Sequence, residues 1–294
     1  MPRTSSSTST VGGSGRPPGQ LFVVATPIGN LQDITDRARR ILCEVALVAA
    51  EDTRHSRKLL QHVGSQARCL SLHRHNEKGR IETIVATLQR GDSVALVSDA
   101  GTPLISDPGY LLLCAVQQAG LAAVPVPGPS AVTAALSVAT VPTERFCFEG
   151  FLPARDKARR ERLQEMHDEQ RAMVFFEAPH RIVATLQCLC DEFGGERPVT
   201  LARELTKQFE TIVHGDLQTT QAGLQEHADH QRGEFVIVVG GAQRVARLRH
   251  DTRDILRTLL EELPPAKAAR IAARLTGDSK KSLYRLAVEL NDDQ

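Results

Sequence analysis

The sequence is poor in aromatic side chains, which limits the ways in which it can hold nucleic-acid bases. Its 294 residues include nine Phe, two Tyr and no Trp. Proteins that bind single strands by base stacking need an aromatic platform, so this composition argues against that mode. The formal net charge of +1 also argues against a histone-like polycation. It leaves open a charged region within the chain.

Long apolar runs are missing as well. One of the longest, Leu111–Val116, is far shorter than the roughly 20 residues of a membrane-spanning helix. Residues 1–19 are rich in Ser, Gly and Pro, so we expect a disordered tail and no signal peptide. Among six Cys, the spacing of Cys188 and Cys190 does not suit a zinc knuckle. These features predict a reduced, cytoplasmic protein without a membrane span.

Several catalytic signatures are absent too. No G-x-G-x-x-G follows the first apolar run, which argues against a dinucleotide site, and no Walker phosphate loop occurs. No G-x-S-x-G turn places a serine nucleophile. His73 and His75 have an H-x-H spacing, but a third ligand would have to come from another loop. We therefore expect no metal.

Short apolar runs alternate with helical patterns over the first half of the chain, which predicts a parallel sheet with helices on its faces. The expected strands are 21–25, 45–50, 68–72, 94–97 and 122–126. The expected helices are 34–42, 80–90, 110–119 and 130–139.

A second α/β unit is expected after residue 142. Its predicted strands are 146–149, 172–176, 199–204, 210–215 and 234–239, and its predicted helices are 157–169, 179–193 and 218–228. The third and fourth of these strands are close in sequence, which indicates a hairpin and hence a mixed sheet.

The C-terminal part of the chain differs from both units. Three helical segments are expected within 251–290, separated by Pro264-Pro265 and by Gly277-Asp278-Ser279, and the last two resemble a helix-turn-helix. Residues 244–285 carry a net charge of +6, which favours a polyanion footprint, although a solvated helical face or a module that packs on the body would look the same. The predicted divisions are a tail, two α/β domains and a basic helical module: 1–19, 20–142, 143–243 and 244–294.

Each expected strand of the first half ends in a polar or Gly/Pro-rich loop. These loops span 26–31, 51–55, 73–77, 98–109 and 127–131. Ligands of open parallel sheets bind beyond the carboxyl ends of the strands, so the five loops predict a binding site. Glycines in the loops permit close backbone approach, and the neighbouring prolines stiffen them.

The loop sequences carry a family resemblance. TPIGNLQDIT (26–35), AAEDTRHS (49–56), LHRHNE (72–77), LVSDAGTPLISDPGY (96–110) and VPGPSA (126–131) are followed in order by FEGFLP (148–153), FFEAPHR (175–181), ARELTKQFE (202–210) and GEFVIVVGG (233–241). This series resembles the 16S ribosomal RNA 2′-O-ribose methyltransferase I family of the tetrapyrrole methylase superfamily. The resemblance covers about residues 20–290.

The resemblance implies two α/β domains with S-adenosylmethionine in the cleft between them, a homodimer, and the small ribosomal subunit as partner. The implied reaction is methyl transfer to the 2′-hydroxyl of a cytidine ribose in 16S rRNA. The implied cofactor residues are Pro27, Ile28, Gly29, Asn30, Ser98, Asp99, Ala100, Gly101, Thr102, Pro103, Pro127, Gly128 and Ser130.

A ribose hydroxyl reacts faster when a nearby side chain takes its proton. Asp99 and Glu77 are the favoured candidates, although a loop-capping carboxylate and a helix-start residue would have the same positions. Further candidates are Glu51, Asp52, His73 and His75. Positioning without a discrete base also remains open.

Phosphate contacts should come from basic side chains near the strand ends and in the helical module. The candidates are Arg54, Arg57, Lys58, Arg74, Arg181, Lys207, Lys280 and Lys281. Two other functions fit the same fold: a methylase acting on a tetrapyrrole or other small molecule, and a non-catalytic RNA-binding factor. The basic module argues against the first and the intact Gly/Pro loops argue against the second.

Overall fold

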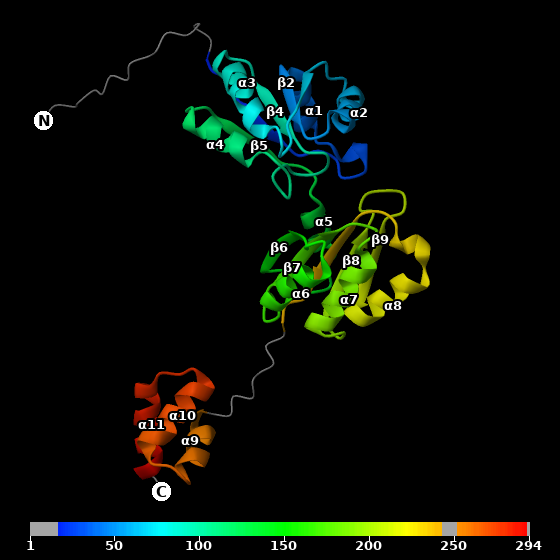
Figure 1. Cartoon of the computed structure of the whole chain (residues 1–294). Coiled ribbons are helices and arrows are strands. Elements are labelled where there is room, and N and C mark those ends of the chain that lie inside the picture. The colour runs from blue at the N-terminus through cyan, green and yellow to red at the C-terminus, as the bar shows by residue number, and fades with distance from the viewer. Residues whose placement is uncertain (1–16, 243–251, 293–294) are drawn as a thin grey trace, which may run out of the picture. The chain divides into compact units, whose positions relative to one another are not determined.

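All strands of the first sheet run in the same direction (Figure 1). The computed structural model describes residues 17–242 and 252–292. The strands of this sheet are β1 (Leu21–Val24), β2 (Leu47–Ala50), β3 (Arg68–Ser71), β4 (Val94–Val97) and β5 (Ala123–Val126), in the order β3-β2-β4-β1-β5. The helices between them are η1 (Leu31–Asp33), α1 (Asp36–Glu44), α2 (Thr53–Val63), α3 (Glu77–Gln89) and α4 (Tyr110–Gln118). The predicted parallel sheet is confirmed.

Alternating side chains of β2 fill two cores, one on each face of this sheet. Val48 and Ala50 pack in a cluster with side chains of α1 and α2, whereas Leu47 and Ala49 pack with side chains of α3 and α4. All four are buried. Both faces are therefore covered, and only the strand ends and the edge strands remain for binding.

Helix α2 was missed in the sequence analysis. Its buried residues Ser56, Leu59, Leu60 and Val63 have the spacing of one helical face. Asp52 caps its N-terminus, and Gly64 ends it with a left-handed φ of 80°. The polar run at the start of α2 is typical of a loop, and the helical spacing of the apolar residues becomes clear only after it.

The second sheet is mixed, as predicted. Its strands are β6 (Phe146–Phe151), β7 (Ala172–Glu177), β8 (Pro198–Arg203), β9 (Thr211–Asp216) and β10 (Phe235–Val239), in the order β6-β7-β10-β8-β9. Strands β6 and β7 are parallel, β10 is antiparallel to β7 and β8, and β8–β9 form the expected hairpin. The carboxyl ends of β6, β7 and β8 therefore lie at one edge.

Helices cover both faces of the second sheet. On one face, α6 (Asp156–Glu165), α7 (Ile182–Phe193) and α8 (Leu217–Glu226) form a core around Phe175, and η2 (Ala228–Gln231) follows them. On the other face, Val132 and Ala135 of α5 (Ala131–Ser137) pack with Val174 and Val238. The predicted boundary after residue 142 follows the change of sheet but not the packing of α5.

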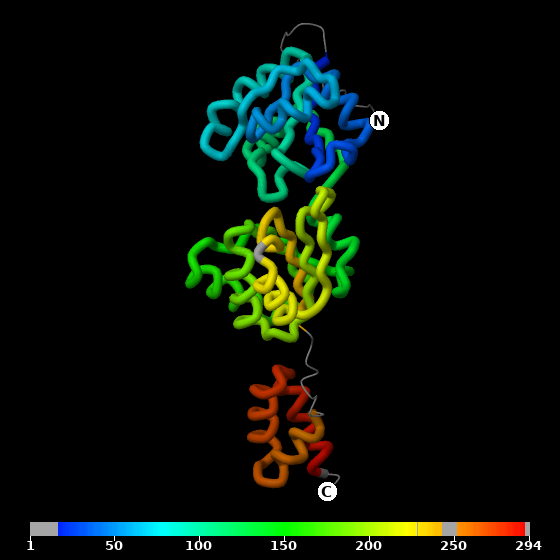
Figure 2. The backbone as a smooth tube through the Cα atoms, turned by 90° about the vertical axis from the view of Figure 1, so that its right-hand side faces the viewer, coloured from blue at the N-terminus to red at the C-terminus, as the bar shows by residue number. Residues whose placement is uncertain are grey.

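The C-terminal helices form their own unit, residues 242–294. Figure 2 shows α9 (Thr252–Leu260), α10 (Pro265–Thr276) and α11 (Lys280–Asp292) side by side, around a core that includes Leu256, Ala269 and Leu283. Gly277 ends α10 with a φ of 78°, as a turn between two helices requires. Over 17–242 and 252–292, no helix is long and apolar enough to cross a membrane.

Truncating Phe175 to Ala should lower the free energy of unfolding by about 3–5 kcal/mol, because it opens a cavity in a closed core. Phe175 is 0% exposed. The matched control is Phe146→Ala at the start of edge strand β6, where the ring is 43% exposed and the loss should stay below about 1.5 kcal/mol. Urea unfolding of both variants measures the difference. Equal losses would contradict this packing.

Candidate functional site

Backbone hydrogen bonds join the loops that follow β1 and β4. Thr26 N donates to Gly101 O at 2.9 Å, and Gly101 N donates to Thr26 O at 3.0 Å. Thr102 Oγ1 donates to Pro129 O at 3.1 Å, which adds the loop after β5. Three segments far apart in the sequence thus form one wall at the carboxyl edge of the first sheet.

Two glycines keep this wall compact. Gly101 has a φ of 79°, and a Cβ there would lie 3.3 Å from Ile28 Cγ2. A Cβ on Gly128 would lie 3.1 Å from Ala25 Cβ. A larger residue at either position would push the loops apart. All three segments predicted for cofactor binding contribute to the wall: 27–30, 98–103 and 127–130.

The same loops meet the second sheet at two places. Asn30 N donates to Thr206 Oγ1 at 3.2 Å, across the gap between η1 and the β8–β9 loop. A Cβ on Gly150 of β6 would lie 3.2 Å from Ser106 Oγ, so the β4–α4 loop also lies against β6. The carboxyl edges of the two sheets therefore face each other through their loops.

Asp99 locks two loops together. Its Oδ1 accepts a hydrogen bond from Asp52 N at 2.9 Å, and its Oδ2 lies 3.9 Å from His55 Nδ1. The side chain is still 42% exposed. Asp52 itself caps α2 and is hydrogen-bonded by the Arg54 side chain, which lowers the pKa of Asp52 to about 2. Asp99 thus combines a structural contact with access to a ligand.

Glu77 lies in a different environment. It is the first residue of α3 and is 5% exposed, and its Oε1 accepts a hydrogen bond from Leu112 N in the first turn of α4 at 3.1 Å. The first backbone N–H groups of a helix lack partners within the helix, so a carboxylate there stabilises the helix end. This placement favours a role in positioning α4 over direct contact with a ligand.

Three carboxylates interact near the ends of β2 and β4. Burial raises the pKa of Asp107 to about 6, with further upward contributions from Glu51 and Asp99, while the Ser98 hydroxyl and Arg74 oppose the shift. The pKa of Glu51 is also raised, mainly by burial and then by Asp99, against the opposing charge of Arg74. A carboxyl that titrates near neutral pH is typical of an acid–base site.

The predicted RNA contacts divide into two groups. In the second domain, Lys207 Nζ lies 2.9 Å from both Glu204 and Glu234, and Arg181 is paired with the buried Glu177 at 3.2 Å. These two cations are committed to internal ion pairs. The remaining candidates have exposed side chains: Arg54, Arg57, Lys58, Arg74, Lys280 and Lys281.

Comparison with known proteins shows to which family the chain belongs. Residues 20–221 match the family model of tetrapyrrole (corrin/porphyrin) methylases, and residues 247–291 match the RsmI C-terminal HTH domain. A ribosomal RNA small subunit methyltransferase I from Xylella fastidiosa is 51% identical over 269 residues, which is 91% of this chain and 98% of that protein. The chain belongs to this family. A Pseudomonas aeruginosa protein of the same name is 50% identical over 92% of this chain and 97% of its own length.

Solved structures with the same fold include other tetrapyrrole methylases. The methyltransferase CobJ superposes with a TM-score of 0.56 at 20% identity, over 77% of this chain and 97% of that one. A uroporphyrin-III C-methyltransferase from Thermus thermophilus, solved in complex with S-adenyl homocysteine, superposes with a TM-score of 0.53 at 16% identity, over 78% of this chain and all of that one. At such identities the likeness concerns the fold alone.

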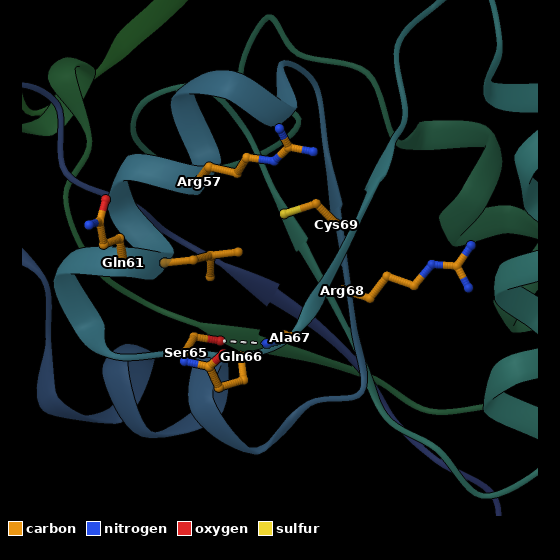
Figure 3. Close-up of a pocket in the computed structure, with 8 residues that line it drawn as sticks. Arg57, Gln61, Ser65, Gln66, Ala67, Arg68 and Cys69 are labelled. Carbon is orange, nitrogen blue, oxygen red and sulfur yellow. Dashed lines mark hydrogen bonds between the residues drawn. The ribbon is translucent and has the colours of Figure 1, made fainter.

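A pocket elsewhere in this methyltransferase does not belong to the site. This pocket has a volume of about 410 Å³. It is lined by Arg57, Leu60 and Gln61 of α2, by residues 65–67 and by Arg68 and Cys69 of β3 (Figure 3). Arg68 starts β3, so this pocket lies toward the amino end of that strand, away from the wall. Among the described residues, no three His, Cys, Asp or Glu side chains are arranged to hold a metal ion.

Asp107 was not among the candidates predicted from the sequence. The loop from Ser98 to Gly109 between β4 and α4 has 12 residues, and long loops in compact domains are frequently functional. The candidates predicted in this loop were residues 98–103, with Asp99 as the catalytic one. What distinguishes Asp107 is burial, and burial depends on the tertiary structure.

We expect Asp107→Asn to remove a pH dependence of stability between about pH 4 and pH 6. The folded protein binds the Asp107 proton with a pKa of about 6, against 3.8 for a free carboxyl. The folded state therefore holds more protons in this interval, and the free energy of unfolding falls as the pH rises through it. Asparagine has no proton to lose. The free energy of unfolding of the variant, relative to that of the wild type, should therefore increase as the pH rises to about 6 and stay constant above it.

Thermal unfolding at pH 4, 5, 6 and 7 measures this difference. Asp36→Asn, at the exposed first position of α1, is the matched control and should run parallel to the wild type. Parallel profiles for Asp107→Asn as well would show that its carboxyl does not titrate in this range.

Proposed function

We propose that this methyltransferase uses S-adenosylmethionine to methylate the 2′-hydroxyl of a cytidine ribose in the 16S rRNA of the small ribosomal subunit. The observation that carries the proposal is a sequence identity of about 50% to proteins named ribosomal RNA small subunit methyltransferase I, along nearly their whole length. The match includes the C-terminal helical module, residues 247–291, which lies outside the part of the chain that matches the tetrapyrrole methylase model. This extra module favours an RNA substrate over a tetrapyrrole.

The wall at the carboxyl edge of the first sheet fits S-adenosylmethionine. Its glycines leave space where a Cβ would fill it, and its hydrogen-bonded loops give a rigid surface, as a preorganised small-molecule site requires. The residues proposed to hold the cofactor are Pro27, Ile28, Gly29, Asn30, Ser98, Asp99, Ala100, Gly101, Thr102, Pro103, Pro127, Gly128 and Ser130. When bound, it supplies an electrophilic methyl group, so the protein needs chiefly to orient the reactants and exclude water.

The two predicted catalytic carboxylates have different proposed roles. Asp99 is exposed enough to contact the substrate or cofactor, and its bond to Asp52 N fixes its orientation. Glu77 acts as a positioning residue, since its carboxylate holds the start of α4 and thereby the end of the β4–α4 loop.

Phosphates of the RNA are proposed to contact Arg54, Arg57, Lys58 and Arg74 near the first sheet, and Lys280 and Lys281 in the helical module. Arg181 and Lys207 contribute by holding the second domain's loops in place. We also propose that the enzyme works in the cytoplasm as a homodimer, as the family resemblance implies.

The decisive experiment supplies tritiated S-adenosylmethionine and small subunits from a strain that lacks the modifying enzyme. We expect one ribose methyl group per 16S rRNA, mapped to a cytidine by nuclease digestion and mass spectrometry. Naked 16S rRNA, large subunits and a porphyrinogen are the comparison substrates. Transfer to the porphyrinogen alone, or no transfer although the cofactor binds, would refute the proposal.

Gly101→Ala should raise the dissociation constant for S-adenosylmethionine about tenfold or more. An alanine there is strained by the positive φ and crowds Ile28, so the loops after β1 and β4 must separate, and ~1.4 kcal/mol of lost binding corresponds to a factor of ten. Gly120→Ala is the matched control, because Gly120 has a φ of 68° but open space around it. Calorimetric titration compares the two. Equal affinities would place the cofactor away from this wall.

The double variant Lys280→Ala/Lys281→Ala should bind small subunits more weakly, with unchanged affinity for the cofactor. The slope of log K against log salt is negative, and loss of two phosphate contacts should reduce its magnitude by about 1.5–2. The control is Lys157→Ala on α6, an exposed lysine paired with Glu161 at 3.8 Å. Filter binding between 50 and 300 mM salt gives the slopes. An unchanged slope for the double variant would remove these lysines from the RNA contact.

A further inference from the structure

One oxygen of Asp107 has no hydrogen-bond partner. Asp107 Oδ2 is shielded from solvent and has no hydrogen bond of ordinary geometry among the described residues, although the Ser98 hydroxyl lies close enough to the carboxyl to lower its pKa. Buried carboxylate oxygens in native proteins are almost always hydrogen-bonded, because desolvation without compensation is costly. An unpaired oxygen at the edge of a binding site is therefore free to accept a hydrogen bond from water or from the hydroxyl of a bound ligand.

The segment before Asp107 has an unusual backbone. Leu104 and Ser106 both have a φ of 74°, in the left-handed region that residues with a Cβ seldom adopt. Strained residues of this kind persist only where the surroundings hold them, and they cluster at functional sites. Arg74 Nη2 donates to Ser106 O at 2.9 Å, which is one such restraint.

The position of this segment is set by both domains. It follows β4 in the first sheet, and Ser106 lies against Gly150 of β6 in the second. Asp107 is thus held beside the facing carboxyl edges of the two sheets. The cofactor wall begins in the same loop, at residues 98–103.

The two carboxylates predicted from the sequence as catalytic candidates already accept hydrogen bonds. Asp99 accepts a hydrogen bond from Asp52 N, and Glu77 accepts one from Leu112 N. The charged groups that act on Asp107 are Glu51 and Asp99, which make its ionisation harder, and Arg74, which makes it easier. The balance leaves the carboxyl able to gain and lose a proton close to neutral pH, as an efficient general base requires.

We propose that Asp107 accepts the proton of the substrate's ribose 2′-hydroxyl, with its unpaired Oδ2 as the acceptor. The O–H bond breaks, the proton moves to Asp107, and the ribose oxygen uses the released electron pair to bond the methyl carbon. The bond from that carbon to sulfur breaks with its pair left on sulfur, and solvent later removes the proton from Asp107. Because Oδ2 is shielded from solvent, the ribose reaches it only when the side chains around it move.

This inference rests on the proposed function, and its test starts from wild-type enzyme that methylates small subunits. We expect Asp107→Asn to lower kcat about 10²- to 10⁴-fold, with the KM for subunits and the calorimetric affinity for S-adenosylhomocysteine within about threefold of the wild type. The wild-type kcat should rise with pH through about 6 and then level off. The residual activity of the variant should lack this limb. Asp36→Asn is the control and should match the wild type.

Chemical rescue separates a proton acceptor from a structural residue. Formate should restore activity to Asp107→Ala in a concentration-dependent manner, because the small carboxylate fits the space left by the side chain, and chloride at equal ionic strength should not. Circular dichroism and cofactor binding verify that both variants are folded.

Three outcomes would overturn the inference. These are a kcat within tenfold of wild type for Asp107→Asn, a pH limb that survives in this variant, and a loss of kcat that Asp99→Asn shows and Asp107→Asn does not. Each of them leaves the proposed function intact. If the wild type itself transfers no methyl group to small subunits, the proposed function fails and this inference fails with it.

Discussion

The paired backbone hydrogen bonds between Thr26 and Gly101 are the contact on which the rest of the site depends. They form an isolated antiparallel bridge between the loops that follow the parallel strands β1 and β4. The left-handed φ of Gly101 lets the chain turn away directly afterwards, toward the bond between Thr102 and Pro129. Without this pair, the loop after β5 and the contact of Asn30 with Thr206 would have no fixed support.

The two α/β domains differ in how their charged side chains are paired. In the second domain, Arg181 and Lys207 neutralise the carboxylates of Glu177 and Glu204 and so stabilise the loops that face the first sheet. The first domain instead leaves carboxylates close to one another, with Arg74 as a counter-charge. Burial and then repulsion between these carboxylates raise the pKa values of Glu51 and Asp107. The cations proposed to contact a polyanion are exposed, at the start of α2 and in the helical module.

Much of the fold was predictable because local patterns agree with the tertiary structure. Strand β4 was expected at 94–97 and is found at Val94–Val97, since a short apolar run between turn residues has few alternatives. The β8–β9 hairpin and the three C-terminal helices follow the same logic. Helix α2 was missed because its start is polar, and the packing of α5 on the second sheet depends on long-range contacts that no local pattern encodes.

The sequence by itself determined the parallel sheet, the five loops at its carboxyl edge and the membership of a methylase family, because periodicity and ordered motifs are local properties of the chain. The tertiary structure alone decided how each carboxylate is placed. Glu77 and Asp99 look alike in the sequence, yet one is buried against the start of α4 and the other is half-exposed. The proposed role of Asp107 has the same source, since burial and the hydrogen-bond partners of an oxygen depend on residues that only folding brings together.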